Sequence, residues 1–151
     1  MESQVITKKK QGFTLMELII VIAIIAILAA VMAPKIVQHV NESRSTGVLQ
    51  NGNAVIGAVE NTIAKSINVN LTSDKLTTEL NKLSITNPVT KGGVAYAIVA
   101  SGAVPTNASL VKGCVYIEVS KGDLTNIQGA KIHRIDAYGE VMQGVVLAGQ
   151  Q

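Results

Sequence analysis

The sequence predicts an α+β protein in which one long N-terminal helix packs on a small antiparallel β-sheet of about four strands. Three features predict this class: an apolar block near the N-terminus, apolar residues at helical spacing after it, and short β-rich runs toward the C-terminus. The chain has 151 residues, enough for one domain with a core of ordinary size. It is 48% hydrophobic but only 3% aromatic and 15% charged, an unusual mixture for a soluble enzyme.

The apolar block runs from Leu18 to Ala33 without a polar side chain. Such a uniform run does not suit a core helix with one polar face. A secretory signal peptide would need small residues at its cleavage site, and Val31-Met32-Ala33 is followed at once by Pro34. Residues 13–33 would form a helix of about 31 Å at ~1.5 Å per residue, enough to cross a ~30 Å hydrocarbon core. We therefore expect a membrane-spanning helix.

The orientation of this helix follows from the charges beside it. Lys8, Lys9 and Lys10 precede the block and are expected to stay in the cytoplasm. Lys35 at the other end is a weak counterweight, so the residues after Pro34 are expected outside.

Glu17 is the exception within the predicted membrane segment. A carboxylate there costs about 2–3 kcal/mol unless it reaches the headgroup layer or finds a partner. A cut between Gly12 and Phe13 would create an α-amino group close by in the sequence. The dipole of a helix N-terminus also favours an acidic residue at this place.

The segment Lys9-Lys10-Gln11-Gly12-Phe13-Thr14-Leu15-Met16-Glu17, followed by the apolar run, resembles the class III leader and N-terminal helix of type IV pilins. The resemblance implies that a prepilin peptidase cuts after Gly12 and methylates Phe13. It also implies that Glu17 pairs with the N-terminal amine of a neighbouring subunit and guides assembly. An unpaired carboxylate in an apolar filament core would be costly, which favours such a positively charged partner.

The helix is expected to continue past Pro34, where proline removes a hydrogen bond and introduces a kink. Beyond it, apolar residues recur mostly at steps of three, four or seven, a pattern typical of one helix face. They are Ile36, Val37, Val40, Val48, Val55, Val59 and Ile63. Gly47, Gly52 and Gly57 each cost the helix about 1 kcal/mol and either permit close packing or mark flexibility.

The remaining residues predict a short helix and a sheet. Leu76, Leu80 and Leu83 indicate the helix, opened by Thr72 or Ser73 as N-cap. Four β-rich runs with turn residues between them, among these Ser101-Gly102 after the first run, favour an antiparallel meander. These runs are residues 94–100, 114–119, 130–137 and 140–147.

The predicted organisation has four parts. Residues 1–12 form a cytoplasmic leader peptide, and residues 13–34 form the transmembrane and assembly half of the helix. Residues 35–65 form its amphipathic half, and residues 66–151 contain the αβ-loop and the C-terminal sheet. This arrangement matches the ladle-like fold of type IV pilins.

Cys114 marks a departure from the family, because many pilins close the C-terminal region with a disulfide and this chain has one cysteine. We expect a small buried thiol.

No catalytic, cofactor or metal constellation is recognised in the sequence. His39 and His133 stand far apart without neighbouring Cys or carboxylate clusters and are expected at the surface. From Phe13 onward ten basic residues balance nine acidic ones, which argues against nucleic acid as a direct ligand. We therefore expect no enzyme, no cofactor and no metal.

The sequence thus predicts a structural subunit that is made as a single-pass precursor in the cytoplasmic membrane. Its expected partners are the membrane, the prepilin peptidase and methyltransferase, the pilus assembly machinery and further copies of itself in a helical, cell-surface filament. Adhesion, twitching motility and DNA uptake stay open as roles. The alternatives are a pseudopilin of a type II secretion or competence system, and an unprocessed single-pass membrane protein. The second alternative leaves the Gly12–Phe13 junction and Glu17 unexplained.

Overall fold

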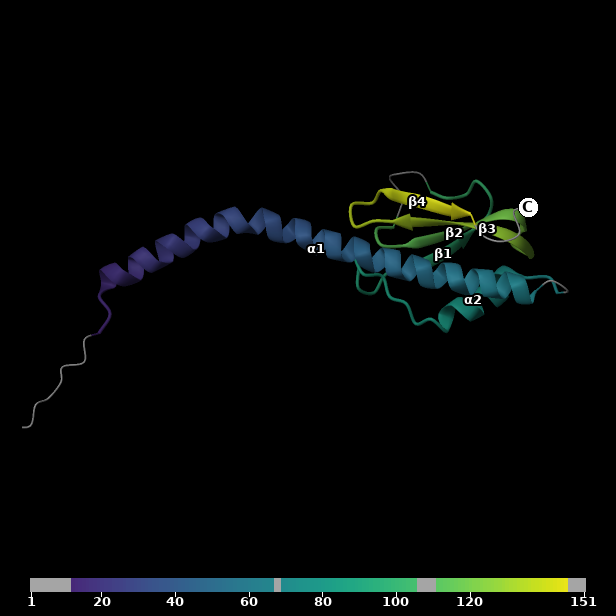
Figure 1. Ribbon diagram of the computed structural model, residues 1–151, viewed down its shortest axis with the longest axis horizontal. Helices are drawn as coiled ribbons and strands as arrows, with labels where there is room; N and C mark the ends of the chain where they lie inside the picture. The colour runs from purple at the N-terminus through teal and green to yellow at the C-terminus, as the bar shows by residue number, and fades with distance from the viewer. Residues whose placement is uncertain (1–11, 67–68, 106–110, 147–151) are drawn as a thin grey trace, which may run out of the picture. The chain divides into compact units, whose positions relative to one another are not determined.

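The computed structural model describes residues 12–66, 69–105 and 111–146, and for residues 143–146 it describes the backbone alone. The chain divides between Gln38 and His39 into two compact units. Helix α1 (Leu15–Lys65) contributes to both units, because it continues without a break past Pro34 and across this division. Figure 1 shows α1 followed by the remaining elements along the chain.

The first unit, in its described part, is the N-terminal portion of α1 and the residues just before it. Every side chain from Gly12 to Gln38 is exposed. In the described part of the chain, α1 is the one helix long and apolar enough to cross a membrane. Its apolar stretch has no protein cover, so the cover must come from lipid or from other apolar surfaces.

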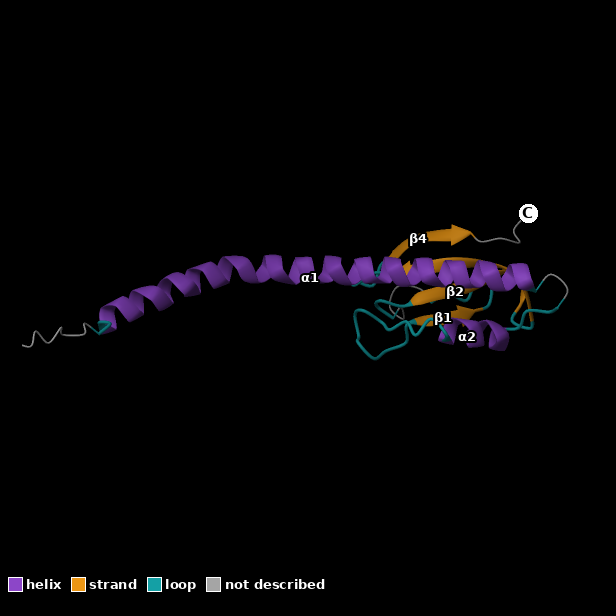
Figure 2. Cartoon of the chain, turned by 60° about the horizontal axis from the view of Figure 1, so that its bottom comes forward, coloured by secondary structure: helices purple, strands orange, loops and turns teal. Residues whose placement is uncertain are grey.

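The second unit contains the C-terminal portion of α1, the short helix α2 (Ser73–Asn81) and four strands. Both views show this portion of α1 lying along the sheet (Figures 1 and 2). Helix α2 begins as predicted, with Thr72 as N-cap accepting a hydrogen bond from the backbone N–H of Lys75. Leu76 and Leu80 of α2 are fully buried.

The four strands form one mixed sheet in the order β1-β2-β3-β4. They are β1 (Tyr96–Val99), β2 (Val115–Asp123), β3 (Asn126–Ile135) and β4 (Val141–Val146). The α+β class, the long helix and the four strands confirm the prediction.

The prediction of an all-antiparallel sheet is wrong for its first pair, because β1 pairs with β2 in parallel while the other two pairs are antiparallel. Ser101-Gly102 had indicated a short turn after the first strand. The connection instead runs through residues 100–114, and a parallel pair needs a crossover of about a dozen residues or more.

The face of the sheet turned to α1 supplies most of the core. Val115, Ile117 and Val119 alternate along β2, and Ala130 and Ile132 stand opposite them on β3. From the helix, Val48, Val55 and Val59 join this cluster, and Ile63 packs against it.

The predicted apolar face of the helix is therefore buried only in part. Ile36, Val37 and Val40 are exposed, although they continue the same stripe. Contact with the strand region begins near Ser45, whose Oγ accepts a hydrogen bond from the backbone N–H of Ala137 at 3.2 Å. The N-terminal members of the stripe thus extend the uncovered apolar surface of the first unit.

The opposite face of the sheet carries a smaller cluster of Cys114, Tyr116 and Ile135. Cys114 has no exposed surface, which agrees with the prediction of a buried thiol. Burial raises the pKa of this thiol to about 11, so the thiolate is not formed at neutral pH.

The same face holds a polar pair that joins β2 to β3. Nε2 of His133 lies 2.8 Å from Oε2 of Glu118, and the two side chains are only 20% and 14% exposed. Oε1 of Glu118 accepts the backbone N–H of Gly102 at 2.7 Å, which ties the crossover connection to the sheet. His133 is therefore only partly exposed at the surface, because its ring lies against a neighbouring carboxylate on the sheet.

These contacts predict a pH-dependent contribution to stability. The hydrogen bond from Gly102 lowers the pKa of Glu118, helped by His133 and Lys131. A group whose pKa is lowered by folding stabilises the fold above its unfolded pKa, and this contribution is lost as pH falls through the folded pKa. We expect Glu118→Gln to reduce the free energy of unfolding by about 1–2 kcal/mol at pH 7.

Urea unfolding of the detergent-solubilised chain measures this effect. The difference between Glu118→Gln and the unchanged protein should shrink as the pH is lowered below the normal range for a glutamate. Glu60→Gln, an exposed position on α1, is the matched control with no expected effect. A Glu118→Gln effect of equal size at every pH would contradict the role of the ionised carboxylate.

Gly52 and Gly57 of α1 differ in the space around them. A methyl group on Gly52 would come within 2.4 Å of Cδ of Arg134, so this glycine permits close packing of α1 on β3. A methyl group on Gly57 would meet nothing within 4 Å. Close packing therefore accounts for Gly52 and leaves Gly57 without a packing reason.

The two glycines predict opposite effects of substitution by alanine. Gly57→Ala should raise the free energy of unfolding by up to about 1 kcal/mol, the helix-propensity difference. Gly52→Ala gains the same propensity but must displace the side chain of Arg134, so we expect net destabilisation. Urea unfolding of both variants tests this, and equal stabilisation by the two would show that Gly52 is not needed for packing.

Candidate functional site

The N-terminus of α1 is closed by a capping box formed by Thr14 and Glu17. The backbone N–H and the Oγ1 hydroxyl of Thr14 both donate to Oε2 of Glu17 at 2.8 Å. Oγ1 of Thr14 accepts the backbone N–H of Glu17 in return, at 3.2 Å. This reciprocal arrangement satisfies backbone donors that a helix start leaves unpaired.

The capping box gives Glu17 a role within its own helix, in addition to the predicted pairing with another subunit. A positive partner, a helix dipole and the headgroup layer were the explanations expected for Glu17. The cap was not predicted, although its signal was present as a threonine three residues before a glutamate and an apolar run. Within the described part of the chain, Oε2 makes these contacts and Oε1 makes none. Oε1 is thus available to a donor from outside the chain.

The predicted processing bond lies just before this cap. Gly12 and Phe13 belong to neither helix nor strand, and Phe13 is 92% exposed. Exposed backbone without regular structure is the form in which proteases reach a peptide bond. Lys8, Lys9 and Lys10 lie outside the described residues.

Pro34 lies inside α1, so the predicted continuation of the helix past this residue is confirmed. Proline has no N–H to donate to the carbonyl of Ala30 four residues earlier, and its ring crowds that carbonyl. The kink itself stays a prediction.

Metal chemistry has no support among the described residues, where no group of three or more His, Cys, Asp or Glu side chains is placed to hold a metal ion. Asp136 and Glu140 are the acidic residues near the end of the chain. Oδ1 of Asp136 accepts three backbone N–H groups of its own turn, from Tyr138, Gly139 and Glu140, each at 2.8 Å. This carboxylate oxygen is therefore occupied in shaping the β3–β4 turn.

An exposed apolar helix that begins with the Thr14–Glu17 capping box and leads into an α+β unit defines a pilin-like architecture. Residues 7–33 match the family model described as the prokaryotic N-terminal methylation motif. The match supports a type IV pilin-like prepilin with a class III leader. It spans the lysines, the Gly12–Phe13 junction, Glu17 and the apolar block, and it ends before Pro34. No solved structure matches the chain.

The capping box predicts a local effect of substitution at Thr14. Thr14→Ala removes the side-chain acceptor and should weaken the helix start by about 1 kcal/mol. In detergent micelles, amide hydrogen exchange of the first turn of α1 should become roughly fivefold faster, as that energy implies. Thr14→Ser keeps the hydroxyl and is the matched control. Unchanged exchange in Thr14→Ala would mean that the box does not hold the helix start.

Proposed function

We propose that this chain is the structural subunit of a type IV pilus. The precursor is held in the cytoplasmic membrane by the first part of α1, cut after Gly12, methylated at Phe13 and polymerised through its apolar helix. The observation that carries the proposal is the exposed apolar segment that forms the C-terminal part of the matched motif. The leader motif implies processing by a prepilin peptidase, and the apolar segment supplies the surface for assembly.

Two environments can cover this segment in succession. In the precursor, lipid tails solvate the apolar side chains between Leu18 and Ala33. In a filament, the same side chains pack against those of neighbouring copies. Transfer between two apolar environments gains little hydrophobic free energy by itself, so specific contacts must direct assembly.

We assign the role of directing assembly to Glu17. Cleavage after Gly12 creates an α-amine on Phe13, next to the Thr14 N–H that already donates to Glu17. With Oε2 engaged in the cap, Oε1 remains for the amine of a neighbouring subunit. Such a charge pair in an apolar surrounding is strongly favoured over either charge alone, which would fix the stagger between adjacent helices.

The proposed processing is tested first by the N-terminus of the natural product. Surface material sheared from expressing cells, analysed by mass spectrometry, should contain a chain that begins at N-methylated Phe13 in sedimentable filaments. A chain that keeps Met1 to Gly12 and stays in the membrane, with the peptidase present, would instead support the unprocessed single-pass protein.

The assembly role of Glu17 is tested by substitution. Glu17→Ala should insert into the membrane normally but reduce the yield of sheared filaments at least about tenfold, because the charge pair is lost. Glu42→Ala, which removes an exposed carboxylate elsewhere on α1, should leave the yield unchanged. Normal yield from Glu17→Ala would remove the proposed role.

Thr14→Ala separates pairing from capping, because it removes the side-chain part of the cap and keeps the carboxylate. We expect most of the filament yield to survive in this variant once its processing has been verified. An equal loss in Thr14→Ala and Glu17→Ala would assign the effect to the helix start instead.

The pseudopilin alternative shares the entire N-terminal motif and predicts the same processing. It differs in the product, since pseudopilins serve a secretion or uptake apparatus. Deletion of the gene distinguishes them: loss of surface filaments supports the pilus subunit, and loss of protein secretion with filaments intact supports the pseudopilin.

A further inference from the structure

A groove between α1 and α2 gathers basic side chains that the proposed function does not use. It contains a cavity of about 430 Å³ between the last turns of α1 and the exposed face of α2. Lys65 lines it from α1, Lys75 comes from α2, and Lys82 lies just past the end of α2. Glu79 is the one acidic side chain of the lining. The groove lies entirely within the second unit.

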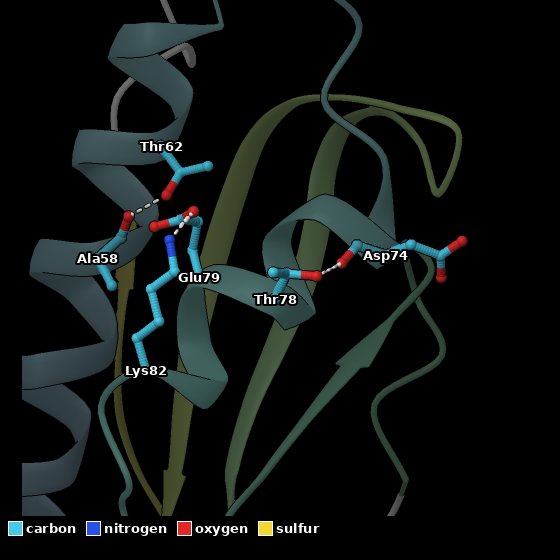
Figure 3. Close-up of polar contacts among 6 residues, drawn as sticks. All are labelled: Ala58, Thr62, Asp74, Thr78, Glu79 and Lys82. Carbon is cyan, nitrogen blue, oxygen red and sulfur yellow. Dashed lines mark hydrogen bonds and ion pairs between the residues drawn. The ribbon is translucent and has the colours of Figure 1, made fainter.

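The lysines are oriented by contacts with their own chain. Nζ of Lys75 donates to the carbonyl oxygen of Asn70 at 3.2 Å. Nζ of Lys82 pairs with Oε1 of Glu79, and Figure 3 shows this pair beside α1. An ammonium group has three N–H donors, so each of these lysines keeps donors for a ligand. The carboxylate of Asp74 points away from the pair (Figure 3).

The hydroxyl groups in the groove offer lone pairs. Oγ1 of Thr62 donates to the carbonyl oxygen of Ala58 at 2.6 Å, and Oγ1 of Thr78 donates to that of Asp74 at 2.9 Å. Both protons are therefore engaged with the backbone (Figure 3). These oxygens, with the carboxylate of Glu79, suit a ligand that brings hydroxyl donors of its own.

The groove continues into a second cavity of about 310 Å³, which shares Thr62, Glu79 and Lys82 with the first. Gly57 lines this extension. A methyl group there would meet no protein atom within 4 Å, so Gly57 leaves open space above α1. Gly57 thus lines a cavity and has no role in packing the helix. This is what we expect of a position that keeps room for a ligand.

We propose that this groove binds a phosphate monoester carried on a hydroxyl-rich group, that is, a sugar phosphate. The three ammonium groups would hold the doubly charged phosphate, and the hydroxyl oxygens and Glu79 would accept hydrogen bonds from the sugar. The chain from Phe13 onward is otherwise close to neutral, so a compact dianion suits the site better than an extended polyanion.

The inference concerns the second unit and does not depend on filament assembly. It is tested on the full chain, labelled with ¹⁵N and held in neutral detergent micelles, by titration with glucose 6-phosphate. At constant ionic strength, the amide signals of residues 62–66 and 75–82 should shift and saturate at millimolar concentrations, as for other sites built from exposed charges. Inorganic phosphate should bind more weakly at the same signals, and glucose alone should give no saturable shift.

Paired variants assign the binding to the groove. Lys75→Gln with Lys82→Gln should weaken glucose 6-phosphate binding roughly five- to tenfold. Lys91→Gln with Lys112→Gln removes the same charge at exposed positions outside the groove and should leave binding unchanged. Equal weakening by the two pairs, or equal shifts with sodium chloride at matched ionic strength, would reduce the effect to general charge attraction and overturn the proposal.

Discussion

The uncovered apolar surface of the first part of α1 is the constraint on which the rest of the structure depends. No described side chain from Gly12 to Gln38 is buried, so this segment cannot remain in water at appreciable concentration. These apolar side chains must therefore be covered by the surroundings of the protein, because its own fold does not cover them. The second unit, in contrast, encloses its core with the C-terminal part of the same helix. The two parts of α1 thus have different surroundings. Val40 is still exposed, whereas Val48 is fully buried against the rest of the second unit.

The capping box gives this apolar segment a defined start. In a membrane or a filament core, unpaired backbone donors at a helix end are costly because no water is present to satisfy them. Thr14 and Glu17 satisfy part of this requirement inside the chain. The carboxylate is thereby held in a fixed place, and in the proposed filament a pre-oriented charge would lose less entropy on pairing.

The sequence predicted best where one local pattern was sufficient. Thr72 as N-cap, with Leu76 and Leu80 one turn apart, specified α2, and the structure agrees. The parallel pairing of β1 with β2 was missed because strand direction depends on the path of residues 100–114, and Ser101-Gly102 resembled a short turn. Direction is a tertiary property that no local period encodes.

Local pattern also decided which site residues could be predicted from the sequence. The Gly12–Phe13 junction and Glu17 were recognisable because the motif is contiguous, and the family match covers the same residues. The basic groove was not recognisable, because Lys65 and Lys82 come from separate elements and meet only in the folded chain. The partial cover of His133 likewise depends on Glu118, which comes from the neighbouring strand.

The continuity of α1 across both units has a mechanical consequence. No loop or linker joins the apolar segment to the folded unit, since Leu15–Lys65 is one helix. Tension applied to the apolar segment would pass through backbone hydrogen bonds directly to Val48, Val55 and Val59, which pack against the sheet. Detaching the helix from the sheet would require these side chains to leave the core together. The mechanical strength of the protein would then depend on the rate of that shearing step more than on its equilibrium stability.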